Sequence, residues 1–306
     1  MDLWLKRLPL LAALVIVSPA LSACSDSTGA LPPDVDRMIL FSAKAAAYPG
    51  VNALYGVMPD GTGLYRFPEQ GLGQIFFPRQ SPDRKQIAFT TANIGGAGSI
   101  WTMRADLIGA HTTYTPSACP NGAGVFTWSP SGDRMLVDCD AAQAVIKVSD
   151  GTSYSLSQMW GRLASAPDWS PVGDKILYQT GSFGGDIYVA NLDGSGATLV
   201  ATSGERARWS PDGTRIAFQR AIPNSNQVIF IVNADGSGER QLTYTPAPTI
   251  RDESPAWSPD GTQLVFIHYD VSQPTFTFHL NVINADGTGQ KSITPDSLQD
   301  ILRPDW

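Results

Sequence analysis

Short apolar runs separated by polar turn residues recur along most of the chain. Typical runs are Ile216 to Phe218, Val228 to Val232 and Leu264 to Phe266, which are rich in β-branched and aromatic residues. Such residues favour strands, and the Gly, Pro and Asp residues between the runs leave little room for long helices. The pattern predicts antiparallel β-structure throughout.

One motif marks each repeating unit. A tryptophan followed by Ser-Pro occurs four times, a degenerate copy starts at a glutamine, and the chain reaches a final tryptophan in the same phase: Trp128, Trp169, Trp209, Trp257, Gln80 and Trp306. Successive motif positions lie 40 to 49 residues apart. A large ring that recurs once per unit suits packing between neighbouring sheets, so we interpret the motif tryptophans as structural.

Two turns recur in each unit. After the motif Trp, Ser-Pro-Asp-Gly suits a tight turn, because Pro presets φ, Asp accepts local hydrogen bonds and Gly tolerates a positive φ. A second turn, Asp-Gly, follows the second apolar run in most units, at Asp60, Asp150, Asp193, Asp235 and Asp286. Two hairpins per unit predict four short antiparallel strands.

These repeats resemble those of the TolB-like propeller family, and the resemblance covers roughly residues 36 to 306. It rests on Trp-Ser-Pro-Asp-Gly, then Ile-Ala-Phe, then an apolar run and Asp-Gly-Ser-Gly, most clearly in residues 209 to 243. The resemblance implies WD-type repeats, six four-stranded blades and a binding role in the bacterial envelope. It also implies that the two recurrent turns share one face, while the loops of varying length lie on the other.

The two ends of the repeat region complete one blade. Met38 to Phe41 is a second-strand sequence without a preceding motif, and Arg303 to Trp306 is a first-strand sequence. Joining them removes the exposed sheet edges of an open ring. We therefore predict an all-β fold over residues 37–306: a six-bladed β-propeller of four-stranded antiparallel blades, closed by the C-terminal strand.

The N-terminal residues predict export and lipidation. Lys6 and Arg7 precede an apolar stretch of residues 8–17, a signal-peptide pattern too short to span a bilayer. Leu21-Ser-Ala-Cys24 resembles the bacterial lipobox, in which the Cys is lipidated and becomes the first mature residue. We expect a signal peptide over residues 1–23, lipid on Cys24 and a flexible tether over residues 24–36. The alternative is an ordinary signal peptide.

Location and partners follow from the same end of the chain and from the charge. Lipid chains would hold the protein on a membrane without spanning it, and Ser25 resembles an outer-membrane signal. The 306 residues carry a net charge of -7, and Lys and Arg are scattered, which argues against nucleic acid as a partner. We expect a monomer of the cell envelope.

Catalytic and metal-binding motifs are absent from the sequence. It contains no Gly-x-Ser-x-Gly, no His-Glu-x-x-His and no Cys-x-x-Cys. The histidines, His111, His268 and His279, fall in two distant blades, which makes a shared metal site improbable. We therefore expect no cofactor and no enzyme activity. For an exported chain we expect a disulfide between Cys119 and Cys139, with two separate thiols as the alternative.

Charged residues concentrate beside the motif positions. The residue before each motif position is, in ring order, Arg79, Thr127, Asp168, Arg208, Ala256 and Asp305. Because side chains alternate along a strand, these residues should line the channel, with Asp168 paired to Arg208 and Asp305 paired to Arg79. Arg206 and Arg303 lie two residues nearer the loop face and should form a cationic mouth.

Functional residues are expected on the variable loops. These are residues 43–52, 91–98, 183–185, 221–227, 251–254 and 269–276. The favoured hypothesis is a membrane-anchored scaffold that binds a protein or peptide through the loop face and the central channel. Two alternatives remain: a glycan-binding module using the aromatic residues Tyr48, Phe183, Tyr269 and Phe276, and a lyase or sugar-converting propeller enzyme with a metal in the channel.

Overall fold

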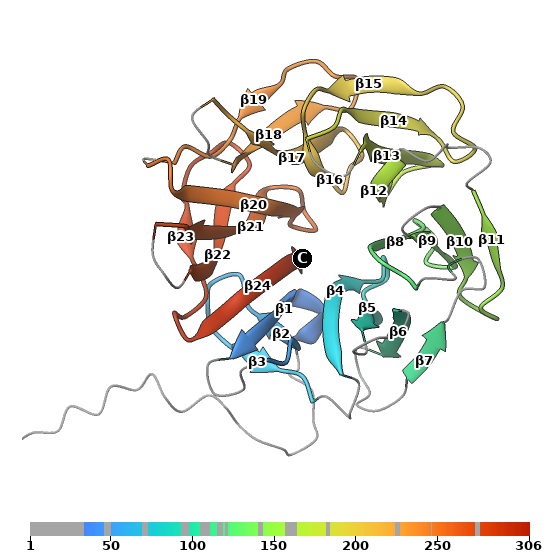
Figure 1. Cartoon of the computed structure of the whole chain (residues 1–306), viewed down its shortest axis with the longest axis horizontal. Helices are drawn as coiled ribbons and strands as arrows, with labels where there is room; N and C mark the ends of the chain where they lie inside the picture. The colour runs from blue at the N-terminus through green and yellow to red at the C-terminus, as the bar shows by residue number, and fades with distance from the viewer. Residues whose placement is uncertain are drawn as a thin grey trace, which may run out of the picture.

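The computed structural model describes residues 34–45, 50–68, 73–92, 98–104, 111–114, 119, 122–139, 143–156, 164–181, 184–223, 227–245, 247–272 and 276–306. In these residues, 24 strands form six antiparallel sheets of four strands each. The sheets stand around a central axis like the blades of a propeller (Figure 1). The all-β, six-bladed architecture is therefore confirmed.

Each blade places one strand nearest the axis and three further out (Figure 1). The innermost strands are β4 (Gln74–Gln80), β8 (Phe126–Trp128), β12 (Ala164–Trp169), β16 (Glu205–Trp209), β20 (Ile250–Trp257) and β24 (Leu298–Asp305). The second strands are β5 (Gln86–Ala92), β9 (Arg134–Asp138), β13 (Lys175–Thr180), β17 (Arg215–Ala221), β21 (Gln263–Asp270) and β1 (Ile39–Ala45).

The outer half of each blade holds the remaining two strands. The third strands are β6 (Ser99–Arg104), β10 (Gln143–Lys147), β14 (Ile187–Asn191), β18 (Gln227–Asn233), β22 (Thr277–Asn284) and β2 (Ala53–Val57). The fourth strands are β7 (His111–Tyr114), β11 (Ser153–Ser155), β15 (Thr198–Ala201), β19 (Arg240–Gln241), β23 (Lys291–Ser292) and β3 (Tyr65–Arg66). Both recurrent turns lie at one end of the strands, which we call the turn face; the other end is the loop face.

The last blade joins the two ends of the fold. β24 pairs antiparallel with β1, with Leu40 opposite Asp305, and Figure 1 shows the red strand beside the blue one. Closure by the C-terminal strand is confirmed. A single 3₁₀ turn, η2 (Val35–Arg37), precedes β1, and Val35 is buried in the core. Val35 thus packs against the blade that β1 begins.

The motif tryptophans pack between blades. Trp169, for example, belongs to an apolar cluster with Leu136 and Val145 of the preceding blade. Trp128, Trp209 and Trp257 are buried in equivalent clusters, whereas Trp306 is only half-buried at the edge of its cluster. Each indole thus removes apolar surface of two sheets from water at once.

The motif turn is held by its own side chains. Ser210 donates from Oγ to Asp212, accepts a hydrogen bond from the N–H of Arg215, and the N–H of Gly213 donates to the Ser210 carbonyl. Gly213 has a φ of +68°, a left-handed conformation that glycine adopts without strain. In the blade that starts at Gln80, Arg84 takes the glycine's place with a φ of +57°.

Five of the six innermost strands contain a bulge three residues before the motif position. The extra residue has a positive φ although it is not glycine: Phe77, Ala166, Arg206, Ser254 and Arg303. A bulge redirects the local side chain and is common beside binding sites. Two of these five residues are the arginines expected at the channel mouth.

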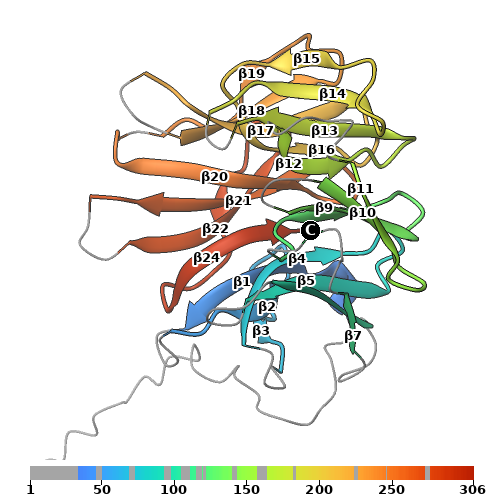
Figure 2. The same ribbon diagram turned by 45° about the vertical axis from the view of Figure 1, so that its right-hand side comes forward.

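The blade of β20 to β23 is longer on the loop face than the sequence pattern suggested. Residues 251–254, expected as a loop, belong to β20, and Arg251 pairs with Tyr269 of β21. The backbone pairing between β20 and β21 extends to both sides of the bulge at Ser254, so both strands reach further toward the loop face. In Figure 2 these strands project past the neighbouring blades.

The N-terminal predictions fall outside the described residues. The expected signal peptide of residues 1–23, Cys24 and the tether up to residue 33 are among the residues left undescribed. In the described part of the chain, no helix has the length and apolar character required to cross a membrane.

Candidate binding site in the central channel

Two arginines and two aspartates form a buried ion network around the axis. Arg79 Nη1 lies 3.0 Å from Asp305 Oδ1, and Arg208 Nη1 lies 3.5 Å from Asp168 Oδ1. Arg79 Nη2 also reaches Asp168 Oδ1, at 3.7 Å, past the intervening blade. These side chains are only 9 to 14% exposed. The structure thus brings together both expected pairs and adds a third contact.

The aspartates also bind backbone groups of the next blade. Asp305 Oδ2 accepts the Gln80 N–H at 2.8 Å, and Asp168 Oδ2 accepts the Trp209 N–H at 2.9 Å. Thr127 Oγ1 accepts the Trp169 N–H at 3.3 Å in the same way. In each case, the residue that precedes the motif position of one blade accepts a hydrogen bond from the motif residue of the next blade and so links the two blades. The predicted ion pairs did not include these links.

A second set of links supports the bulges. Gln179 Oε1 accepts the Arg206 N–H at 2.9 Å, Gln219 Oε1 accepts the Ser254 N–H at 2.8 Å, and Asp138 Oδ2 accepts the Ala166 N–H at 3.2 Å. All three acceptors lie ten residues after a motif tryptophan. This periodic polar residue was the signal that could have revealed them.

Arg206 is not the free cation that we expected. Its Nη1 lies 3.0 Å from Glu253 Oε2 and donates to Ser254 Oγ at 2.7 Å. Glu253 also accepts a 2.6 Å hydrogen bond from the Tyr269 hydroxyl. Burial and this bond to a carboxylate raise the pKa of Tyr269. The cationic mouth of two arginines is therefore corrected: an acidic residue of the neighbouring blade neutralises Arg206.

Arg303 forms no such ion pair among the described residues, and the charge of the Asp138 carboxylate offsets only part of the burial that lowers its pKa. Its guanidinium lies over the Phe77 ring, 4.8 Å from the centroid, and its buried Nη1 has no hydrogen-bond partner in that part of the chain. Burial, followed by the charges of Arg206 and Arg208, lowers its pKa well below the ordinary value. Burial likewise lowers the pKa of Arg208 to about 10. Of the four channel arginines, Arg303 is thus the one without a carboxylate in ion-pair contact among the described residues.

The turn face of the channel opens into a pocket of about 210 Å³. Three motif-turn prolines, Pro82, Pro130 and Pro171, line it together with Arg79 and Asp305. The ion network can therefore be approached from this side.

An aromatic cluster marks the loop face of the longest blade. The Tyr269 and Phe278 rings stack at 4.9 Å, and Phe276 meets Phe278 edge-on at 6.1 Å while remaining 48% exposed. Of the four aromatic residues named from the sequence, Tyr269 and Phe276 come together here. Tyr48 and Phe183 lie outside the described residues.

The remaining candidate residues lie elsewhere. Cys119 and Cys139 form a buried disulfide, with Cα atoms 5.0 Å apart. His268 Nδ1 lies 2.7 Å from Asp252, and His279 Nε2 lies 3.7 Å from Asp296. In the described part of the chain, no group of three or more His, Cys, Asp or Glu side chains is placed to hold a metal.

Six four-stranded blades around a charged channel define the class of the molecule, a six-bladed β-propeller. The family model of the TolB beta propeller domain matches residues 60–306, and the chain belongs to this family. No curated protein matches the sequence.

Solved structures show the same fold. The crystal structure of TolB from Acinetobacter baumannii is similar with a TM-score of 0.68 and 19% identity, covering 90% of this chain and 68% of that one. A chain in the crystal structure of a nidogen/laminin complex is similar with a TM-score of 0.65 and 11% identity, covering 88% of this chain and 97% of that one. Oligogalacturonate lyase from Vibrio parahaemolyticus has a TM-score of 0.54 and 14% identity, covering 84% and 74%.

Proposed function

We propose that the protein is a non-enzymatic binding scaffold of the bacterial envelope, which holds a protein or peptide through its loop face and central channel. The observation that carries the proposal is Arg303. Its Nη1 is buried without a hydrogen-bond partner among the described residues, whereas Arg79, Arg206 and Arg208 each form an ion pair with a carboxylate. The Asp138 carboxylate acts on Arg303 electrostatically without forming such a pair.

An acidic group of the partner suits this position. A buried guanidinium nitrogen without a hydrogen-bond acceptor is unfavourable, so a carboxylate that reaches the Arg303 guanidinium would relieve that cost. Phe77 already holds the guanidinium from one side. The planar fork of an arginine binds a carboxylate with two parallel hydrogen bonds.

The surrounding structure is organised before any partner arrives. The bulge places Arg303, and the ion network and the interblade hydrogen bonds tie the innermost strands together. Binding would therefore order few protein groups, which lowers its entropic cost.

The aromatic cluster supplies an apolar anchor close to the same mouth. Tyr269 is linked through Glu253 to Arg206, and Phe276 stands exposed beside it. Exposed aromatic residues next to arginines are typical of the centres of protein interfaces. We propose that a partner places an apolar side chain against Phe276 and an acidic one toward Arg303.

We also propose that Cys24 carries the lipid anchor and that the propeller is a monomer at the outer membrane. Replacement of Cys24 by serine tests the anchor: the protein should move from the membrane fraction to the soluble fraction. The N-terminal peptide of the mature protein should simultaneously lose the mass of the acyl chains. A variant that stays in the membrane fraction would contradict the anchor.

Capture of partners from native membranes tests the binding site. The variant Arg303→Met keeps the length of the side chain and removes its charge, and Lys147→Gln removes an exposed charge on the turn face as the matched control. After chemical cross-linking, Arg303→Met should lose a protein that the wild type and Lys147→Gln both retain. Unchanged capture by a folded Arg303→Met protein would overturn the proposal.

Glycan binding is the second candidate, because the exposed Phe276 and its neighbours form an aromatic surface of the kind on which sugar rings stack. Titration with soluble cell-wall glycans separates the two: Phe276→Ala should abolish glycan binding, whereas Arg303→Met should not. The enzyme alternative, a lyase or sugar-converting propeller with a channel metal, predicts a stoichiometric metal ion in the purified protein.

A further inference from the structure

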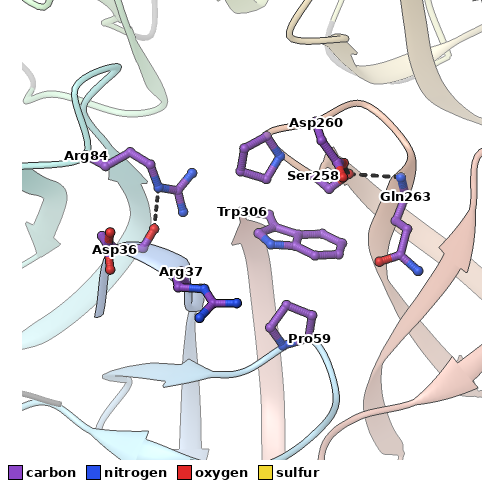
Figure 3. A pocket seen from close by; sticks show the side chains of 9 residues that line it. Asp36, Arg37, Pro59, Arg84, Ser258, Asp260, Gln263 and Trp306 are labelled. Atoms are coloured by element: carbon purple, nitrogen blue, oxygen red, sulfur yellow. Dashed lines mark hydrogen bonds between the residues drawn. The ribbon is translucent and has the colours of Figure 1, made fainter. Parts of the chain in front are cut away.

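Among the described residues, the closing blade has no counterpart of one turn that the other blades possess. In five blades a Ser-Pro turn connects the first two strands, but β24 and β1 come from opposite ends of the fold and no such turn joins them. A pocket of about 360 Å³ lies at this place, which we call the seam pocket. Figure 3 shows the indole of Trp306 at its centre, with Pro59 on one side and Arg84 on another.

The neighbouring blade shows what normally fills this position. A Cβ on Gly261 of its turn would lie 3.4 Å from Pro211 of the preceding turn, so the two turns pack closely. Arg215 stacks on the Trp257 ring at 4.6 Å and donates to the Gly261 carbonyl at 2.9 Å.

Both surfaces are left open at the seam. Pro259, the counterpart of Pro211, lines the pocket. The counterpart of Arg215 is Gln263, whose amide donates to Asn284 Oδ1 at 3.0 Å. In the part of the chain that the structure describes, the half-buried Trp306 ring therefore has neither the equivalent arginine nor the equivalent turn beside it.

Arg84 adds a cation to this pocket. All four other motif turns carry glycine with a positive φ at the equivalent backbone position: Gly132, Gly173, Gly213 and Gly261. A left-handed arginine is strained where glycine is not. Its Nε donates to the Asp36 carbonyl, whereas its buried Nη2 has no hydrogen-bond partner in the described part of the chain.

The other charges of the pocket do not satisfy that group. Asp260 Oδ1 already accepts from the Ser258 hydroxyl at 2.6 Å and from the Thr262 N–H at 3.0 Å. The Asp305 and Asp36 carboxylates both act on Arg84 electrostatically, but neither accepts a hydrogen bond from its Nη2. Arg37 brings a second cation to the same wall. The Arg84 Nη2 in the seam pocket therefore still lacks a hydrogen-bond acceptor among the described residues.

We propose that the seam pocket binds a proline-containing acidic turn of a partner protein, with the proline ring against Trp306 and the carboxylate on Arg84. The shape follows from the Ser-Pro turns that fill the equivalent place in the other blades, and the charge follows from Arg84. The pocket lies on the turn face, opposite the loop-face site proposed above. The propeller would thus present two independent binding surfaces.

A peptide taken from the chain itself serves as the probe. Acetyl-Ser-Pro-Asp-Gly-Thr-amide has the sequence of residues 210–214 and 258–262. Titrated into the full-length protein with ¹⁵N-labelled tryptophan, it should shift the Trp306 indole resonance, assigned by Trp306→Phe, in a saturable way. The Asn-for-Asp peptide should bind roughly fivefold more weakly, because a charge-assisted hydrogen bond is lost.

Two variants separate binding from a structural role of Arg84. Arg84→Gly restores the residue of the other turns, so the melting temperature should stay the same or rise, while the preference for the Asp peptide disappears. Lys85→Gln removes an exposed charge of the same turn and should leave binding unchanged. An Arg84→Gly protein that melts earlier and still prefers the Asp peptide would overturn the proposal, as would the absence of a saturable shift.

Discussion

Replacing Asp168 with alanine should destabilise the propeller by about 4 kcal/mol. The change leaves the Arg208 guanidinium, 7% exposed, without its 3.5 Å carboxylate and removes the acceptor of the buried Trp209 N–H. Breaking a buried ion pair costs about 3 to 5 kcal/mol, and an unsatisfied buried N–H about 1 to 3. The two losses share one carboxylate and are not additive.

Asp168→Asn separates the charge from the hydrogen bond. The amide oxygen can still accept the Trp209 N–H, so only the attraction to Arg208 and Arg79 is lost. We expect about half the effect of the alanine variant, roughly 2 kcal/mol. Arg79 retains Asp305 at 3.0 Å, which limits the damage to one side of the network.

Equilibrium unfolding in urea, followed by tryptophan fluorescence, measures both values. Asp174→Asn is the matched control, since Asp174 is an exposed aspartate of the same blade and its substitution should change stability by less than about 0.5 kcal/mol. A loss below about 1 kcal/mol for Asp168→Ala would refute the reasoning that this buried carboxylate holds neighbouring blades together.

Three further predictions concern other parts of the fold. Deletion of residues 303–306 removes Asp305 and Trp306 and should lower stability by about 3 to 5 kcal/mol; an unchanged melting temperature would rule out closure by this strand. The disulfide between Cys119 and Cys139 joins residues 20 positions apart, and its reduction should lower the free energy of unfolding by about 3 kcal/mol. Before reduction, a thiol reagent should label neither cysteine; labelling of both would show that the disulfide is absent. Hydrogen bonds from Ser or Thr lower the pKa of turn aspartates such as Asp212 and Asp260. The free energy of unfolding that these aspartates contribute is therefore complete above the unfolded pKa of about 3.9 and is lost as the pH falls below it. A urea unfolding midpoint that rises between pH 6 and pH 3 would contradict this prediction.

The blades could be predicted because their information is local and repeated. The motif tryptophan, the proline turn and the Asp-Gly turn each fix a short segment, and their spacing counts the blades. The same repeat spacing predicted the closing strand, because Met38 to Phe41 and Arg303 to Trp306 are the second and first strands of one repeat unit.

The contacts within the channel were harder to predict from the sequence. Alternation along a strand placed Asp168 and Arg208 correctly on the axis side, but a bulge breaks alternation and the motif does not reveal it. Glu253 therefore appeared to lie in a loop, although it belongs to β20 and neutralises Arg206. The contact of Arg79 with Asp168 crosses an intervening blade, and no sequence spacing encodes that distance.

Closure of the ring by its two ends also sets the order in which the chain can complete its fold. Lys44 and Asp300 meet at 2.6 Å although 256 residues separate them, so β1 cannot acquire its inner neighbour until nearly the whole chain has emerged. Contacts of such long range are made late and slow folding. During that interval β1 keeps an open edge, which invites strand addition from other chains. A chain that lacks β24 would keep that edge exposed.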